Sequence, residues 1–229
     1  MSRGYGDYCP IAKASEILAE RWTPLIIRNL HLDCHTFTEI HEGIPRMSRT
    51  LLTLRLRSLE RAGVVESRPN ASKRGRRYEL TRSGHELAQV CLEMGAWGAR
   101  WLELGPRDYD PGIVLWAWKK CLLPARLPDR RVVVRFELKD RKKQRFWLLM
   151  EKPRVELCMK DPGFEVDLVV TTDSVTLTRV HAGRIALREA QRIGAWAMEG
   201  PRDLVRAFPT WGGLSYYANV QPAVTAASA

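Results

Sequence analysis

The sequence predicts an α+β protein with two domains, a largely helical one followed by one that contains a sheet. Three observations support this expectation. Apolar residues recur at helical spacing through the first hundred residues, apart from two short strand-like runs. Gly, Pro and Asp crowd into GPRDYDPG, residues 105–112, which is typical of a linker. Beyond it, strand-like runs precede helical ones, and this order favours an α+β domain with an antiparallel sheet.

The chain has 229 residues, which is enough for two domains of ordinary size. We therefore expect domains at residues 1–108 and 109–220. The remaining residues, 221–229, have little to bury and are expected to form a tail.

The charge is strongly basic and unevenly distributed. The net charge of +11 and the pI near 9.8 favour a polyanionic partner, and the total leaves nucleic acid, an anionic membrane surface and an acidic protein open. Residues 46–82 hold eleven Lys or Arg against three Glu, so much of the excess lies in one short segment. A second basic cluster, KDRKKQR at 139–145, lies between two strand-like runs and is best explained as a solvated turn. The alternatives are an added DNA contact and a gate for an anionic ligand.

Several classes of protein are disfavoured. No apolar run approaches the roughly 18 to 20 residues that a membrane-spanning helix needs, and MSRGYGDYCP lacks the apolar core of a signal peptide. Five scattered cysteines without a CxxC pair indicate reduced thiols, so we expect a cytoplasmic protein with no membrane partner. These cysteines are Cys9, Cys34, Cys91, Cys121 and Cys158.

Four helices are predicted before the strand-like runs. The first two cover about 11–19 and 23–31, and Pro24 fits the first turn of the second. Thr36 or Thr38 is the expected N-cap of a short helix at 37–42. Each of the first two helices is expected to bury an apolar stripe. The stripes are Ile11, Ala14, Ile17 and Leu18 in the first, and Trp22, Leu25, Ile26 and Leu30 in the second.

The fourth helix, about residues 48–62, has an N-cap at Ser48 and a stop at Gly63. Its apolar face carries Leu52, Leu56 and Leu59, and another face carries Arg49, Thr53 and Arg57. The runs VVESRP and RRYELT then predict a β-hairpin with a basic turn that contains Gly75.

A long helix at about 83–104 follows the hairpin. Its apolar residues share one face, and Gly95 and Gly98 suggest that another helix approaches closely. The apolar face comprises Leu87, Val90, Cys91, Met94, Trp97 and Trp101.

This order of elements predicts a winged helix-turn-helix, in which one helix enters the major groove of DNA and the hairpin, or wing, contacts the backbone. The alternative is a solvated basic helix face beside a hairpin tip whose charges protect the sheet edge. The order and spacing of the two features together favour DNA binding. The candidate DNA contacts are Ser48, Arg49, Thr50, Thr53 and Arg57 on the helix, and Lys73, Arg74, Arg76 and Arg77 on the wing.

Residues 8–104 also resemble the HxlR family of bacterial transcriptional regulators. The resemblance lies in CPIAKASEILAERWTPLIIRNL, FTEIHEGIPRMSRTLLTLRLRSLERAGVVES and YELTRSGHEL. It implies a homodimer on double-stranded operator DNA, with contacts between subunits from the N-terminal segment and the helix at about 83–104. A regulator of the MarR or PadR type, with a different dimer, is the alternative within this class.

The resemblance further implies a candidate redox sensor at Cys9, since some family members sense oxidants or electrophiles through an N-terminal cysteine. A thiolate at a helix start is stabilised by the helix dipole, but an inert, partly buried cysteine is the more common case. Cys34 with His31, His35 and His41 lacks a complete ligand set, so we predict no metal and no cofactor.

The second domain is expected to contain strands in RVVVRFELKD, RFWLLMEK, RVELCMKD and VDLVVTTD, and later in AWAMEG. Helices are expected on both sides of Gly183 and in PRDLVRAFPTW. The pattern over about 130–209 resembles the sterol carrier protein 2 (SCP2) type domain, which implies a cavity for an apolar effector. The alternative is a domain that serves only in dimerisation. The candidate lining residues, which are otherwise ordinary core, are Phe136, Phe146, Leu148, Val169, Leu177 and Trp196.

We expect a DNA-binding transcriptional regulator that an apolar ligand or a thiol switch modulates. The alternative is a lipid carrier whose helical half makes contacts with other proteins. An enzyme is disfavoured, because the sequence contains no phosphate-binding Gly-rich loop, no HExxH and no carboxylate with an evident partner.

Overall fold

The structure is a computed structural model that describes residues 4–71, 75–141 and 144–223. It divides into two compact units, residues 1–98 (unit 1) and 99–229 (unit 2), and the division falls within a helix. The domain boundary expected after residue 108 lies in the loop that follows this helix.

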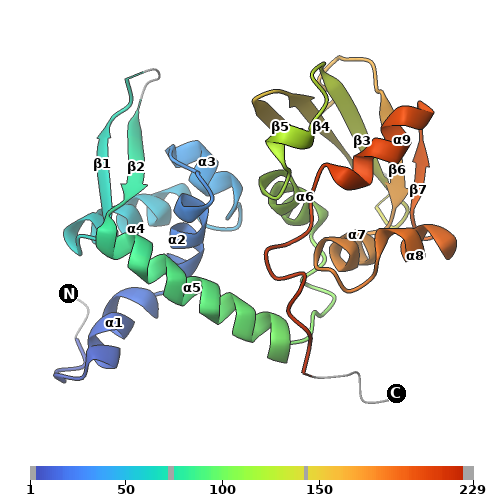
Figure 1. The fold of residues 1–229 in the computed structure, drawn as a ribbon. Helices are drawn as coiled ribbons and strands as arrows, with labels where there is room; N and C mark the ends of the chain where they lie inside the picture. Colours follow the sequence, from blue (N-terminus) through green and yellow to red (C-terminus); the bar gives the residue numbers. More distant parts are fainter. Residues whose placement is uncertain (1–3, 72–74, 142–143, 224–229) are drawn as a thin grey trace. The chain divides into compact units, whose positions relative to one another are not determined.

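Unit 1 contains five helices and a β-hairpin within the described residues (Figure 1). The predicted order of elements is confirmed. The elements are α1 (Pro10–Leu18), α2 (Thr23–His31), α3 (Phe37–Glu42), α4 (Arg49–Arg61), β1 (Val65–Pro69), β2 (Arg76–Leu80) and α5 (Arg82–Trp101), the last of which continues into unit 2.

The short helix α3 begins with a capping box, in which the Thr36 side chain accepts from the Glu39 amide while Glu39 reaches back to the Thr36 amide. Of the two candidate caps, the structure therefore selects Thr36. The core of unit 1 forms where α2, α3 and α4 meet. The buried side chains there are Ile26 and Ile27 of α2, Ile40 of α3, and Leu52, Leu56 and Leu59 of α4.

The predicted burial is wrong for the stripe of α1 and for Leu25 of α2, which is 36% exposed. Every residue of α1 keeps some exposure, and Ile11 is 77% exposed. On α5, a stripe formed by Val90, Met94, Trp97 and Trp101 is also exposed, by 47% to 59%. Amphipathic spacing predicts that a face needs a partner, but it does not say that the partner lies in the same chain.

Unit 2 contains a five-stranded sheet with the strand order β5-β4-β3-β6-β7 (Figure 1). Its strands are β3 (Val132–Leu138), β4 (Arg145–Glu151), β5 (Arg154–Cys158), β6 (Leu168–Thr172) and β7 (Ala197–Glu199). Its helices are α6 (Pro111–Lys120), α7 (Ser174–His181), α8 (Leu187–Arg192) and α9 (Arg202–Ala207), with 3-10 turns η1 (Pro124–Arg126) and η2 (Phe208–Thr210).

The predicted antiparallel sheet requires a correction, because β3 and β6 are parallel. Strands β3, β4 and β5 form an antiparallel meander, so β6 joins at the free side of β3. The chain between β5 and β6 crosses back to the end of the sheet at which β3 begins. Strand β6 therefore runs in the same direction as β3. The sheet is mixed, and the remaining strand pairs are antiparallel.

Helix α6 was not predicted, because its start lies in the segment interpreted as a linker. Asp110 caps the helix by accepting hydrogen bonds from the amides of Gly112 and Ile113, and Pro111 occupies the first turn. The residues that suggested a loop thus supply a helix start.

Candidate nucleic-acid interface

Helix α4 is positioned by its cap and by its leucine face. The Ser48 Oγ accepts a hydrogen bond from the Leu51 amide at 3.2 Å, and this fixes where the helix begins. Because the leucine face is buried, the opposite face is directed away from the core of unit 1. The predicted contact residues Ser48, Arg49, Thr50 and Arg57 are exposed, and Thr53 is half-buried.

Besides Ser48, which caps the helix, two of these side chains have contacts within the unit. The Arg49 guanidinium lies 5.9 Å from the centre of the Phe37 ring, a cation–π distance, so α3 supports the side chain at the start of α4. The Thr53 hydroxyl donates to the Arg49 carbonyl at 3.0 Å, and its oxygen can still accept a hydrogen bond.

The turn between α3 and α4 is held by polar contacts that sequence reasoning missed. The Asn29 side chain, which is fully buried, donates to the Ile40 carbonyl at 2.8 Å. Arg28 donates to the Gly43 carbonyl at 3.0 Å, and the His41 Nε2 donates to the Met47 carbonyl at 2.8 Å. These bonds satisfy carbonyls next to the turn and so fix the direction in which α4 starts.

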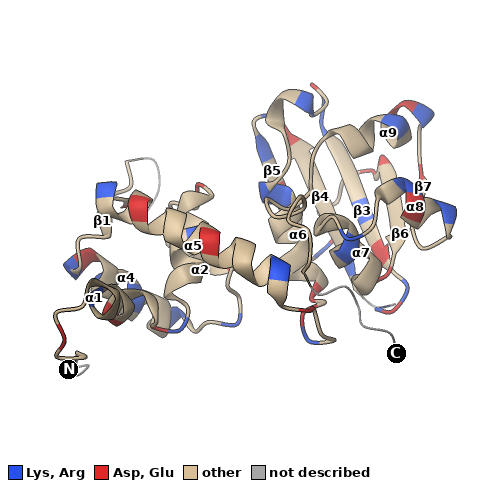
Figure 2. Ribbon diagram, turned by 60° about the horizontal axis from the view of Figure 1, so that its bottom comes forward, with Lys and Arg blue, Asp and Glu red and all other residues tan. Residues whose placement is uncertain are grey.

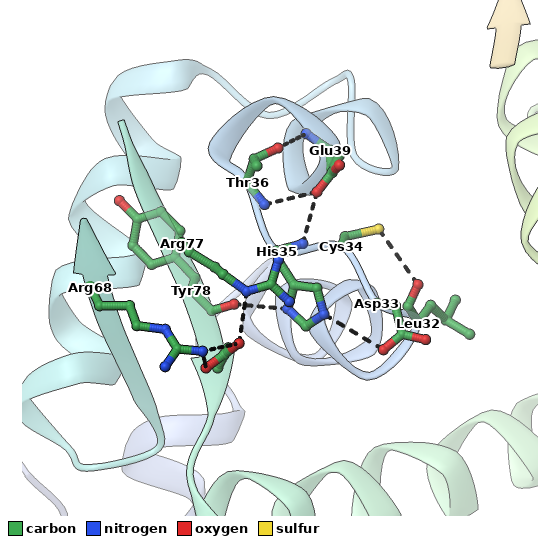
Figure 3. A network of polar contacts seen from close by, with 10 residues as sticks. Leu32, Asp33, Cys34, His35, Thr36, Glu39, Arg68, Arg77 and Tyr78 are labelled. Carbon is green, nitrogen blue, oxygen red and sulfur yellow. Dashed lines mark hydrogen bonds and ion pairs between the residues drawn. The ribbon is translucent and has the colours of Figure 1, made fainter. Parts of the chain in front are cut away.

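The wing is joined to the rest of unit 1 through His35 (Figure 3). The Tyr78 amide donates to the His35 carbonyl at 2.8 Å, and the His35 Nδ1 donates to the Tyr78 carbonyl at 3.1 Å. The His35 Nε2 lies 3.6 Å from the Asp33 carboxylate, and Thr36 forms an antiparallel bridge with Arg77. An isolated bridge therefore attaches the segment before α3 to β2, beside the two-stranded hairpin.

The described wing arginines make contacts within the chain. Arg76 donates to the Ser67 hydroxyl at 2.7 Å, and Ser67 in turn donates to Glu60 of α4. Arg77 and Arg68 both pair with Glu79 at 2.8 Å (Figure 3). The hydrogen bond from Arg77 lowers the pKa of Glu79, with a further contribution from Arg68.

These contacts give Arg76 and Arg77 a structural role in bracing the hairpin. The other two predicted wing contacts, Lys73 and Arg74, lie outside the described residues.

The histidines and the cysteine considered for a metal serve other purposes. Two of the histidines bond backbone carbonyls, as described above, and Cys34 is fully buried. Within the described ranges, no group of three or more His, Cys, Asp or Glu is arranged to hold a metal ion.

The candidate lining residues of unit 2 do not surround one cavity. Phe136, Phe146, Leu148, Leu177 and Trp196 belong to the packed core between the sheet and the helices. Val169 lies on the other face of the sheet, because its neighbours in β6, Leu168 and Val170, point into that core and side chains alternate along a strand.

The arrangement in unit 1 defines a winged helix-turn-helix protein: α2 and α3 support a capped, basic α4, and a braced hairpin follows it. The model of HxlR-like helix-turn-helix proteins matches residues 17–106. YvaP of Bacillus subtilis (strain 168), an HTH-type transcriptional regulator, is 35% identical over 100 residues, which are 42% of this chain and 92% of YvaP. The chain belongs to the HxlR-like helix-turn-helix family.

A further relative is YodB of Bacillus subtilis (strain 168), another HTH-type transcriptional regulator. It is 37% identical over 100 residues, which are 42% of this chain and 88% of YodB. A solved structure of reduced YodB matches 43% of this chain and 99% of its own, with 35% identity and a TM-score of 0.37. These relatives are regulators, in agreement with the prediction that the chain is not an enzyme. In the part of the chain that the structure describes, no helix is long and apolar enough to cross a membrane.

The braces on the wing lead to a prediction about Glu79. Replacing Glu79 with Gln removes the charge that holds Arg68 and Arg77, so both cations become available to phosphates. We expect Glu79→Gln to bind duplex DNA more tightly, and its log K against log[salt] slope to steepen by up to roughly 0.9 for each new phosphate contact. Fluorescence anisotropy over a salt series measures both quantities.

Glu66 provides the matched control, since it lies directly opposite Glu79 in the hairpin and is exposed. Glu66→Gln changes the net charge by the same amount at nearly the same place. If the salt slope changed equally in the two variants, the change in net charge, and not the release of Arg68 and Arg77, would explain the tighter binding.

Proposed function

We propose that the protein binds double-stranded operator DNA as a homodimer, with the exposed face of α4 in the major groove and the wing against the backbone. The observation that carries this proposal is the orientation of α4: its leucines are buried, while Arg49, Thr50 and Arg57 stay exposed. Side chains near the start of a recognition helix reach base edges, and those farther along reach phosphates.

Within this helix we assign different roles to two arginines. Arg49 occupies the first turn and rests on Phe37, so its guanidinium is held ready for a base edge. Arg57 lies two turns farther along, where a cation contributes affinity that is independent of sequence.

The two roles predict different outcomes on mutation. Arg49→Ala should reduce the preference for the selected operator over scrambled DNA by about 1–3 kcal/mol, because a base contact is lost. Arg57→Ala should weaken binding to both DNAs by the same factor. Competition anisotropy with the two duplexes measures the ratio, and an unchanged preference in Arg49→Ala would show that the helix is oriented differently.

The homodimer is proposed from the exposed stripe on α5. Its four large apolar residues are spaced by four, three and four positions and thus share one side of the helix. Figure 2 shows few charged residues along α5. An uncovered apolar stripe of this kind is costly in water and is typical of an interface between subunits. Gly95 and Gly98, between and beside these residues, allow a second helix to approach closely.

Placing a charge in this stripe should separate the subunits. We expect Trp97→Glu to shift the protein from dimer to monomer in sedimentation velocity, because an unpaired carboxylate would be buried at the interface. The control is His85→Glu: His85 is exposed and lies nine residues before Met94, on the opposite side of the helix. A dimer that persists in Trp97→Glu would place the interface elsewhere.

We also propose that Cys9 is the thiol through which oxidants act. Cys9 lies at the amino end of α1 and, like Cys91, Cys121 and Cys158, is partly buried, whereas Cys34 is fully buried. Burial raises the pKa of Cys91 to about 11 and also raises that of Cys121 and Cys158. Because the thiolate is the reactive form, burial protects these other thiols.

The order of thiol reactivity tests this role for Cys9. After brief treatment with limiting hydrogen peroxide, peptide mass spectrometry should find oxidation first at Cys9, and Cys9→Ser should retain operator binding while losing its sensitivity to peroxide. An even distribution of oxidation over the five cysteines would contradict a sensor at Cys9.

We further propose that unit 2, with its likeness to the SCP2-type domain, is the effector-binding part. The alternative, a lipid carrier whose helical half contacts other proteins, predicts no preference for any DNA sequence.

A further inference from the structure

Unit 2 contains a cleft of about 340 Å³ that the candidate lining residues do not reach. The cleft lies between α7, α8, η2 and the segment 212–219, and its size is within the range that small-molecule sites have. Most of its lining is apolar. The lining residues include Trp118, Val180, Ile185, Leu187, Pro209 and Leu214.

Trp118 is the one lining residue with a buried polar group that lacks a partner. The side chain is 3% exposed and stacks on Trp196 and Phe208, with ring centres 5.9 and 6.1 Å away. Its indole N–H has no acceptor among the described residues. A buried donor without an acceptor is destabilising, so a bound molecule that accepts from this N–H gains affinity.

A glycine outside the lining residues packs against the indole ring of Trp118. Gly213 packs so closely on the indole edge that a Cβ there would lie 2.2 Å from the Nε1, and both Gly212 and Gly213 have positive φ.

We propose that this cleft binds a small molecule with an apolar ring body and a hydrogen-bond acceptor, and that the acceptor pairs with the Trp118 N–H. The apolar lining selects the body of the ligand, and the single unpartnered donor selects the acceptor. The proposal that the cleft binds a ligand does not depend on DNA binding. Only the effect of the ligand on DNA affinity rests on the proposed function.

The cleft is connected to the end of α5 through Arg184. Arg184 lies between the lining residues Gly183 and Ile185. Its guanidinium donates to the Val220 carbonyl and to the Ala99 carbonyl, both at 2.7 Å.

Ala99 is in the last turn of α5, where carbonyls lack partners within the helix. One guanidinium thus holds the segment that walls the cleft and the carboxyl end of α5. A ligand that displaces this segment changes the support of α5, the helix proposed to form the dimer.

Two probes of nearly equal shape test the cleft in the full-length protein. 2-Acetylnaphthalene carries a carbonyl acceptor, and 2-isopropylnaphthalene does not. By calorimetry we expect the ketone to bind about 2- to 12-fold more tightly, the ratio that corresponds to one net hydrogen bond of roughly 0.5–1.5 kcal/mol. Trp118→Phe should abolish this preference while retaining weaker binding of both probes.

A second variant keeps the test decisive if Trp118→Phe fails to fold. Ala186 is exposed at the cleft, so Ala186→Trp should block both probes. The control is Ala197→Trp, at an exposed position on β7, which should bind as the parent protein does. Equal affinity for the two probes in the parent protein, or unaltered binding in Ala186→Trp, would overturn the proposal.

DNA affinity measured with and without the ketone tests the connection. We expect saturating ketone to change the operator affinity of the parent protein, and Arg184→Gln to bind the ketone equally well without this change. Ketone binding that leaves operator affinity unchanged would refute the role of Arg184. Failure to find any preferred DNA would refute the proposed function, while the calorimetric result on the cleft would still hold.

Discussion

The burial of one leucine face of α4 is the constraint on which the candidate interface depends. Leu52, Leu56 and Leu59 are at most 2% exposed and belong to the core of unit 1. Burying a leucine side chain stabilises the fold by about 1.5–3 kcal/mol. Rotating α4 about its axis would expose these leucines and remove that stabilisation. The polar face of the helix is consequently fixed in direction, and Arg49, Thr50 and Arg57 are exposed on it.

Directional polar contacts fix the positions of α4 and the wing more exactly than apolar packing does. Asn29 and His41 bond carbonyls on the two sides of the turn before α4, and His35 bonds the backbone of β2. These are directional bonds between elements that are distant in sequence, so they fix the start of the helix and the root of the wing relative to each other. Arg76 and Arg77 likewise pair with residues of the same chain and brace the hairpin. The proposed contact between the wing and DNA therefore depends on the shape of the hairpin as well as on the number of its cations.

The sequence predicted local structure well where a local signal exists. The Ser48 cap, the stop at Gly63 and the leucine spacing defined α4, and Gly183 separated α7 from α8, because capping and periodicity act over a few residues. Asp110 and Pro111 were misinterpreted, since the same residues begin helices and form turns. The parallel pairing of β6 with β3 depends on a crossover between distant segments, and no local pattern encodes it. Partners of individual charges, such as Glu79 for Arg77, and the exposure of the α5 stripe likewise follow only from tertiary structure.

The central claim is that α4 reads a DNA sequence, and selection from a random duplex pool tests it most directly. The full-length protein is bound to the pool at about 0.15 M salt, and the bound DNA is sequenced over successive rounds. We expect one preferred motif with two related half-sites, bound at least about 10³-fold more tightly than scrambled DNA. Enrichment of no motif, with binding that depends on salt alone, would contradict the claim.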